Sequence, residues 1–209
     1  MSYAVKEAFL TLQGEGAQSG RRAVFIRFAG CNLWSGREED RATAQCNFCD
    51  TDFVGFSVDG GRYGDAEALA AEAVKLWGDD PEDRFVVLTG GEPMLQVDEP
   101  LIDALHARGF TIAMESNGTI AAAPGIDWLC ISPKAGTDVV QRSGQELKLV
   151  FPQPGLDPRD LEGWDFDHFF LQPMDGISRN DYRDATIDYV MEHSKWRLRL
   201  QTHKLIGLG

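Results

Sequence analysis

Three cysteines, Cys31, Cys46 and Cys49, are the residues of this chain best suited to metal chemistry. Three thiolates can bind three irons of a [4Fe–4S] cluster and leave the fourth iron open to another ligand. The Cys-x-x-Cys spacing also suits zinc or a redox dithiol, so spacing alone leaves these alternatives open. A structural zinc site needs a fourth ligand, and the histidines lie far away in the sequence, at 106, 168, 193 and 203. We therefore favour the cluster with an open iron.

The fourth cysteine, Cys130, lies in the apolar run of residues 128–131. A free cysteine in such a run packs as a small hydrophobic side chain. We expect Cys130 to belong to a core strand and to lie outside the metal site.

The composition predicts a single globular domain over residues 1–209, with 43% hydrophobic residues. Twenty basic and 33 acidic residues give a net charge of −13, which argues against an extended nucleic-acid contact and favours a small-molecule substrate. The first residues lack a secretion signal, and no apolar run is long enough for a membrane span. We expect a cytoplasmic protein, because thiols stay reduced there and available to metal.

Strand-like runs alternate with helical ones, which is typical of an α/β fold. The expected helices begin at Asp65 and Asp98, which are suited to cap them, and end at Gly78 and Gly109; a third spans residues 180–193. Seven strands are expected, a number on the scale of a barrel, at residues 24–29, 85–88, 110–114, 128–132, 146–151, 169–171 and 197–200.

Most of these strands end in a polar or glycine-rich motif. The motifs are residues 30–31, 89–93, 115–117, 132–134, 172–175 and 201–204. Each motif alone is an ordinary turn. If the strands are parallel, however, their carboxyl ends share one rim and the motifs converge on one cavity. The repetition therefore predicts an active site at that rim.

The three cysteines and Thr-Gly-Gly-Glu-Pro at 89–93 resemble the radical S-adenosylmethionine (SAM) superfamily. More narrowly, residues 12–16, 132–134, 146–148, 172–175 and 201–204 resemble motifs of the 7-carboxy-7-deazaguanine synthase family. The resemblance covers nearly the whole chain. It implies a radical SAM core, a partial TIM-like barrel of mostly parallel strands with outer helices.

One departure from the superfamily pattern is an insertion in the cysteine motif. Fourteen residues, 32–45, separate Cys31 from Cys46, where the usual spacing has three; some synthases carry this insertion too. Closing the longer loop costs only about 1.4 kcal/mol more, so we expect the cluster to assemble. The charged run 37–41 within the insertion is expected to be a solvated surface turn or short helix, with docking of an electron donor as the alternative.

The resemblance implies a lyase that converts 6-carboxy-5,6,7,8-tetrahydropterin to 7-carboxy-7-deazaguanine with loss of ammonia, in 7-deazapurine (queuosine) biosynthesis. The implied cofactors are a [4Fe–4S] cluster on Cys31, Cys46 and Cys49, SAM, and Mg²⁺ at Thr51. The implied partners are a flavodoxin- or ferredoxin-like electron donor and a second copy of the chain. Two alternatives are a radical activase that acts on a protein and a zinc-binding module without enzymatic activity.

Site residues follow from the matching motifs. The implied SAM-binding positions are Phe48, Cys49, Asp50, Gly90, Gly91, Glu92, Ser132, Pro133, Lys134, Gln172, Pro173, Met174 and Asp175. The implied pterin-binding positions are Leu12, Gln13, Gly14, Glu15, Arg27, Thr89, Glu115, His203 and the terminal Gly209. Glycine lets the backbone approach a ligand closely, and Arg27 offers a carboxylate a two-pronged hydrogen bond.

Overall fold

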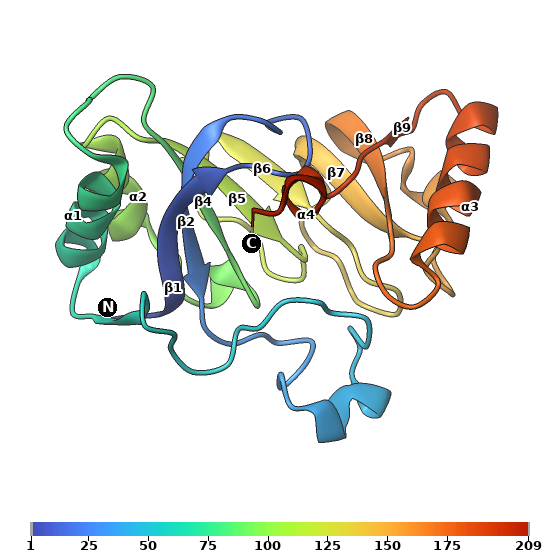
Figure 1. The fold of residues 1–209 in the computed structure, drawn as a ribbon, viewed down its shortest axis with the longest axis horizontal. Helices are drawn as coiled ribbons and strands as arrows, with labels where there is room; N and C mark the ends of the chain where they lie inside the picture. The colour runs from blue at the N-terminus through green and yellow to red at the C-terminus, as the bar shows by residue number, and fades with distance from the viewer. Residues whose placement is uncertain (1, 209) are drawn as a thin grey trace.

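The computed structural model describes residues 2–208, which form a nine-stranded sheet with helices packed against it (Figure 1). The order of the strands across the sheet is β3-β1-β2-β4-β5-β6-β7-β8-β9. Their bounds are β1 (Tyr3–Leu12), β2 (Arg22–Phe28), β3 (Gly61–Tyr63), β4 (Phe85–Gly90), β5 (Thr111–Ser116), β6 (Trp128–Ile131), β7 (Ser143–Phe151), β8 (Asp165–Pro173) and β9 (Arg197–Leu198).

The sheet is mostly parallel and open. Every neighbouring pair from β2 to β9 is parallel, whereas β1 pairs antiparallel with both β2 and β3. The strands β3 and β9 form its two edges, so the ring of strands is incomplete. This arrangement confirms the partial TIM-like barrel.

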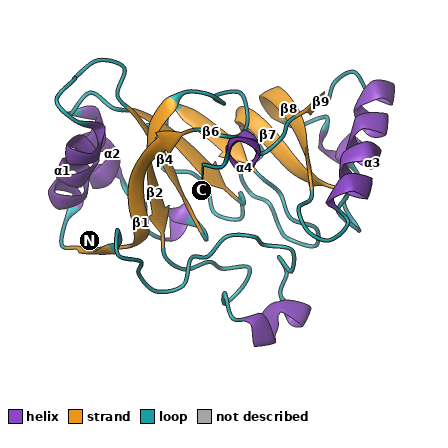
Figure 2. Cartoon of the chain, viewed as in Figure 1, coloured by secondary structure: helices purple, strands orange, loops and turns teal. Residues whose placement is uncertain are grey.

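The longer α-helices lie at the two ends of the sheet. Figure 2 shows α1 (Ala66–Trp77) and α2 (Glu99–His106) together at one end, and α3 (Arg179–Glu192) at the other. The short helix α4 (Thr202–Ile206) follows β9, and three 3₁₀ helices are η1 (Glu38–Thr43), η2 (Pro93–Leu95) and η3 (Pro158–Leu161). Within residues 2–208, no helix is both long and apolar enough to cross a membrane.

Local sequence explains where the first two helices begin. The Asp65 carboxylate accepts a hydrogen bond from the Ala68 amide, and the Asp98 carboxylate accepts one from the Leu101 amide. Both are N-caps, as expected. Gly78 ends α1 with a φ of 93°, which glycine adopts readily.

All seven expected strands are present, but the sequence analysis missed β1 and β3. The pattern of β1 is hard to recognise because a bulge between Val5 and Glu7 interrupts its alternation of buried and exposed residues. β3 is only three residues long. The last strand, expected to extend to residue 200, ends at Leu198, and the motif 201–204 that follows it lies at the start of α4.

Cys130 is a core residue, as expected. Its side chain on β6 is 4% exposed, and its thiol lies 3.6 Å from Glu146 Oε1. The same carboxylate accepts hydrogen bonds from the Ala17 amide and the Trp128 indole. Cys130 therefore belongs to the packing of β6 against β7.

Candidate active site

A cavity of about 860 Å³ lies at the carboxyl ends of the parallel strands. Its lining includes Arg27 of β2, Thr89 of β4, Glu115 of β5, Lys148 of β7 and Gln172 of β8. The volume is in the range of small-molecule and cofactor sites. The predicted convergence of the strand-end motifs on one cavity is confirmed.

The three cysteines of the motif line this cavity as free thiols. Cys31 follows β2, and Cys46 and Cys49 lie in the loop between η1 and β3. The Leu33 amide donates a hydrogen bond to Cys31 Sγ at 3.4 Å. A hydrogen bond between the other two thiols lowers the pKa of Cys49 to about 6 and raises that of Cys46. Cys49 is therefore the thiol of this pair that ionises more readily.

The donor set fits a cluster better than a single metal ion. In the described part of the chain, no three His, Cys, Asp or Glu side chains converge on one ion position. The thiolates of a [4Fe–4S] cluster bind separate irons, so they need not converge. Three thiols on one cavity therefore match a cluster with an open iron.

The Gly90-Gly91 pair packs against the cysteine loop. A Cβ at Gly91 would lie 2.1 Å from the Gly30 carbonyl oxygen and 2.8 Å from Cys31 Cβ. A Cβ at Gly90, whose φ is +148°, would lie 2.4 Å from the Phe28 carbonyl oxygen. Glycine is thus required by the contact between β4 and the end of β2, which brings this backbone next to the cluster position.

The Glu92 side chain lies beneath the residues that line the cavity. It is fully buried and, like Pro133, does not line the cavity. Its carboxylate accepts hydrogen bonds from Ser116 Oγ at 2.8 Å and from the amides of Asn117 and Met94 at 2.8 and 3.0 Å. Burial raises its pKa. Glu92 therefore fixes the glycine pair to the end of β5.

The remaining predicted SAM positions line the cavity: Phe48, Asp50, Ser132, Lys134, Gln172, Pro173, Met174 and Asp175. Lys134 Nζ donates to the carbonyl oxygen and hydroxyl of Ser132 at 2.6 and 2.8 Å, and burial lowers its pKa. Gln172 Oε1 is buried and has no hydrogen-bond partner among the described residues. A buried acceptor without a donor is costly, so Gln172 fits a site that a ligand with N–H or O–H groups completes.

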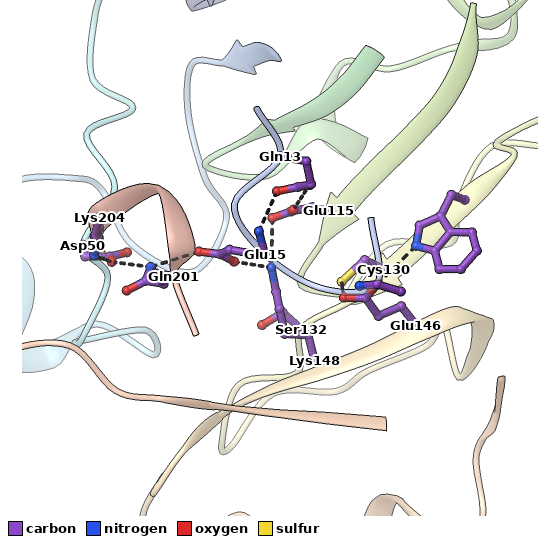
Figure 3. A network of polar contacts seen from close by, with 12 residues as sticks. Gln13, Glu15, Asp50, Glu115, Cys130, Ser132, Glu146, Lys148, Gln201 and Lys204 are labelled. Carbon is purple, nitrogen blue, oxygen red and sulfur yellow. Dashed lines mark hydrogen bonds and ion pairs between the residues drawn. The ribbon is translucent and has the colours of Figure 1, made fainter. Parts of the chain in front are cut away.

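A second group of polar residues in the cavity centres on Lys148 (Figure 3). Lys148 Nζ lies 2.5 Å from Glu15 Oε2 and 3.1 Å from Glu115 Oε2. Gln13 donates to Glu115 at 3.0 Å, and Gln201 donates to Glu15 at 2.9 Å. Two carboxylates with one ammonium group leave a net negative charge that suits the N–H groups of a heterocycle.

Burial and ion pairing shift the pKa values of this pair. Burial opposes ionisation of Glu15, but the Lys148 ammonium and the hydrogen bonds outweigh it and lower the Glu15 pKa. Burial likewise opposes charge on Lys148, but Glu115 and Glu15 raise its pKa well above the ordinary value. Glu15 and Lys148 are therefore both charged near neutral pH.

The other predicted pterin positions within the described residues also line the cavity. They are Leu12, Gly14, Arg27, Thr89 and His203, together with the predicted magnesium position Thr51; Gly209 lies outside the described residues. Arg27 Nε donates to Glu7 Oε1 at 2.7 Å across the β1–β2 pair. The Gly14 carbonyl oxygen accepts a hydrogen bond from the Thr202 amide at 2.9 Å, which fixes α4 beside the cavity.

Comparison with known proteins identifies the family. Over all 209 residues the chain is 58% identical to the 7-carboxy-7-deazaguanine synthase of Bordetella pertussis, which it covers completely. It is 59% identical to the enzyme of that name from Caulobacter vibrioides, again over the full length of both. The chain belongs to the 7-carboxy-7-deazaguanine synthase family. No protein-family model matches it.

A solved structure agrees with this family assignment. The crystal structure of QueE from Escherichia coli superposes with a TM-score of 0.71 at 27% sequence identity, covering 97% of this chain and 95% of that one. The resemblance drawn from the motifs is thereby confirmed, and with it the radical SAM lyase class.

Sequence reasoning missed one central residue of this synthase-family site. Lys148 appeared only as part of the motif 146–148, and no role was assigned to it. The sequence feature that could have identified Lys148 is its charge within the otherwise apolar run 147–151 of a parallel strand. A lysine buried at such a position requires a charged partner, and Glu15 and Glu115 are those partners.

Proposed function

We propose that the chain converts 6-carboxy-5,6,7,8-tetrahydropterin to 7-carboxy-7-deazaguanine with loss of ammonia, by radical SAM chemistry in 7-deazapurine (queuosine) biosynthesis. One structural observation supports the proposal independently of the names of the relatives. A single cavity holds the three free thiols together with Arg27 and the buried Glu15–Lys148–Glu115 group. Cluster binding and recognition of a polar heterocycle are thus combined in one site.

The thiolates of Cys31, Cys46 and Cys49 would hold the cluster, and Gly90, Gly91, Ser132, Lys134, Gln172 and Asp175 would hold SAM. When bound, these cofactors supply one-electron chemistry that removes a hydrogen atom from carbon. Lys134 adds a half-buried ammonium group to this wall, and Gln172 adds a free acceptor. The protein supplies position and shielding from water.

On the substrate side, Arg27 anchors the pterin carboxylate. Glu7 occupies its Nε, so the guanidinium is held in one orientation while its terminal nitrogens make no hydrogen bond to described residues. Glu15 and Glu115 accept hydrogen bonds from the N–H groups of the ring. Lys148 keeps both carboxylates in place.

Magnesium belongs to the same proposal. Thr51 offers an oxygen ligand in the cavity that Arg27 also lines, so a cation there can bind the substrate carboxylate together with water. The family resemblance further supports a flavodoxin- or ferredoxin-like electron donor and a homodimer. We also propose the cytoplasm as the compartment, because all four cysteines are free thiols and would stay reduced there.

The decisive experiment is anaerobic reconstitution with iron and sulfide, followed by incubation with SAM, a reductant and the carboxytetrahydropterin. We expect 7-carboxy-7-deazaguanine by mass spectrometry and stoichiometric ammonia. A reconstituted protein that binds its cluster and cleaves SAM but leaves the pterin unchanged would disprove the proposed substrate. A preparation that holds zinc and takes up no iron would disprove the radical mechanism. Sedimentation velocity tests the dimer.

A further inference from the structure

The insertion 32–45 is an ordered part of the cysteine loop, and its charged run 37–41 leads into an exposed short helix, one of the two expected forms. Its 3₁₀ helix η1 lies on a long loop that extends away from the sheet (Figure 1, light blue). The Ser35 hydroxyl donates to Asp40 Oδ2 at 2.5 Å within the insertion. Gly36, with a φ of +80°, packs so closely that a Cβ there would lie 2.3 Å from Val54 Cγ2. The insertion therefore folds back on residues that follow the Cys-x-x-Cys motif.

Arg41 makes the contacts that join η1 to the cysteines. Its Nη1 donates to the carbonyl oxygens of Asn47 and Cys49, both at 3.0 Å. Its Nε lies 2.8 Å from both carboxylate oxygens of Glu38. One guanidinium therefore holds the backbone of the Cys46–Cys49 turn and is itself oriented by a neighbouring carboxylate.

The same guanidinium also contacts the part of the loop that follows Cys31. It lies over the Trp34 ring, 4.2 Å from the ring centroid. Trp34 is 8% exposed, lines the cavity and packs edge-on against Phe53 at 5.6 Å. Arg41 thus bridges the two ends of the loop, with Trp34 on the Cys31 side and the Asn47 and Cys49 carbonyls on the other.

Such a bridge has a physical function in a loop this long. Fourteen residues between the first two thiols leave their separation poorly restrained by the chain alone. Interactions that orient ligand residues typically change metal affinity by about tenfold or more. A permanent positive charge near a cluster also favours its reduced state. The Glu38 carboxylate that pairs with Arg41 is largely exposed, so solvent screens its negative charge and it offsets the Arg41 charge only in part.

We propose that Arg41 is a positioning residue of the cluster site, which holds the Cys46–Cys49 turn in register with Cys31 and raises the reduction potential of the cluster. This inference rests on the proposed function, because it requires that the three thiolates bind a cluster. It assigns to the insertion a role in cluster retention.

The test compares Arg41→Ala and Arg41→Lys with a control in the same insertion. The control is Arg37→Ala, because the Arg37 side chain is 72% exposed and its nearest carboxylate oxygen, on Glu39, is 3.9 Å away. Each protein is reconstituted anaerobically. The measurements are the rate of iron release to a chelator and the midpoint potential of the cluster from redox titration followed by electron paramagnetic resonance.

We expect Arg41→Ala to release iron about tenfold faster than wild type and to have a more negative midpoint potential. Arg41→Lys keeps the charge but loses the planar fork, so it should release iron faster at a near-normal potential. Arg37→Ala should match wild type in both. Circular dichroism of the iron-free proteins checks that each variant is folded.

Two results would overturn the inference: iron release at the wild-type rate from folded Arg41→Ala, or equally fast release from Arg37→Ala. The second would mean that any change in the insertion loosens the site. Failure of the proposed function looks different: wild type would then take up no iron, or would bind its cluster normally and leave the pterin unchanged.

Discussion

A single buried charge organises much of the substrate side of this cavity. The Lys148 side chain is 5% exposed and contacts carboxylates from the loop after β1 and from β5. Breaking a buried ion pair by removing one partner is far more costly than loss of a surface pair, because the other charge is left uncompensated. Motif residues could be predicted from the sequence because their types carry the chemistry. Lys148 could not, because its role depends on partners distant in the chain.

At the cysteines, we expect any one of Cys31→Ala, Cys46→Ala and Cys49→Ala to abolish SAM cleavage, because each removes one of only three thiolates. Iron content and 5′-deoxyadenosine release are the measurements. The control is Cys130→Ala, which should keep its cluster and lose about 1 kcal/mol of stability through poorer packing. Cleavage at the wild-type rate by Cys46→Ala would contradict the assignment.

For Arg27, the substitution Arg27→Lys should weaken pterin binding about tenfold, which is about 1.4 kcal/mol. Lysine keeps the charge but lacks the planar guanidinium that binds a carboxylate through two hydrogen bonds. It also lacks the Nε group through which Glu7 orients the Arg27 side chain. Binding of the pterin and of SAM is measured separately. The idea fails if SAM affinity falls and pterin affinity is unchanged.

For Thr51, we expect Thr51→Ala to raise the magnesium concentration that gives half-maximal turnover, while iron content stays normal. Oxygen ligation of Mg²⁺ and thiolate ligation of iron are separate chemistries. Thr51→Ser, which keeps the hydroxyl, should restore the wild-type titration. Identical magnesium curves for wild type and Thr51→Ala would remove Thr51 from the metal site.

At the scale of elements, the parallel strands position the proposed cofactor side, whereas β1 and α4 complete the proposed substrate side. The parallel strands were predictable because most of them are compact apolar runs that end in a motif. The strand β1 and the helix α4 were not, because a bulge obscures the first and only five residues form the second. The antiparallel addition of β1 brings Gln13 and Glu15 to the cavity.

The contact between these two elements is tight at Gly14. A Cβ there would lie 2.1 Å from His203 Nδ1, so Gly14→Ala must displace His203 or the start of α4. Such overpacking costs about 1–3 kcal/mol. We expect lower stability in thermal unfolding and weaker pterin binding, with normal iron content. The control is Gly64→Ala, because a Cβ at Gly64 meets no atom within 4 Å. Equal pterin affinity in both variants would show that α4 does not shape the substrate site.

At the scale of the whole molecule, charged contacts close the cavity between segments far apart in the chain. Lys148 joins β7 to Glu15 and to Glu115 (Figure 3). Lys204 of α4 joins Asp50 to Asp175 at 2.7 Å each. Composition alone gave only a net charge of −13. It could not show which few charges are buried, because burial follows from the order of the strands.

The two partners of the Glu15–Lys148 pair predict different dependence of stability on pH. The Glu15 pKa lies below its ordinary 4.5, so its stabilisation is present above that value and is lost as pH falls through the folded pKa. The Lys148 pKa lies above its ordinary 10.5, so its contribution is present below that value and is lost as pH rises through the folded pKa. Both contributions are therefore complete between about pH 4.5 and 10.5.

The substitution Lys148→Met should lower the free energy of unfolding at pH 7 by about 3–5 kcal/mol, because it leaves Glu15 buried and unpaired. Without the ammonium group, burial raises the Glu15 pKa, and protonation then relieves the unpaired charge. The deficit relative to wild type should therefore shrink as pH falls from 7 to 5. The control Lys204→Met, at a pair about 40% exposed, should cost less than about 1 kcal/mol at every pH. Urea unfolding of iron-free wild type, Lys148→Met and Lys204→Met measures the free energy of unfolding of each. If the loss of stability in Lys148→Met stayed constant from pH 7 to 5, Glu15 would not depend on Lys148 for its charge.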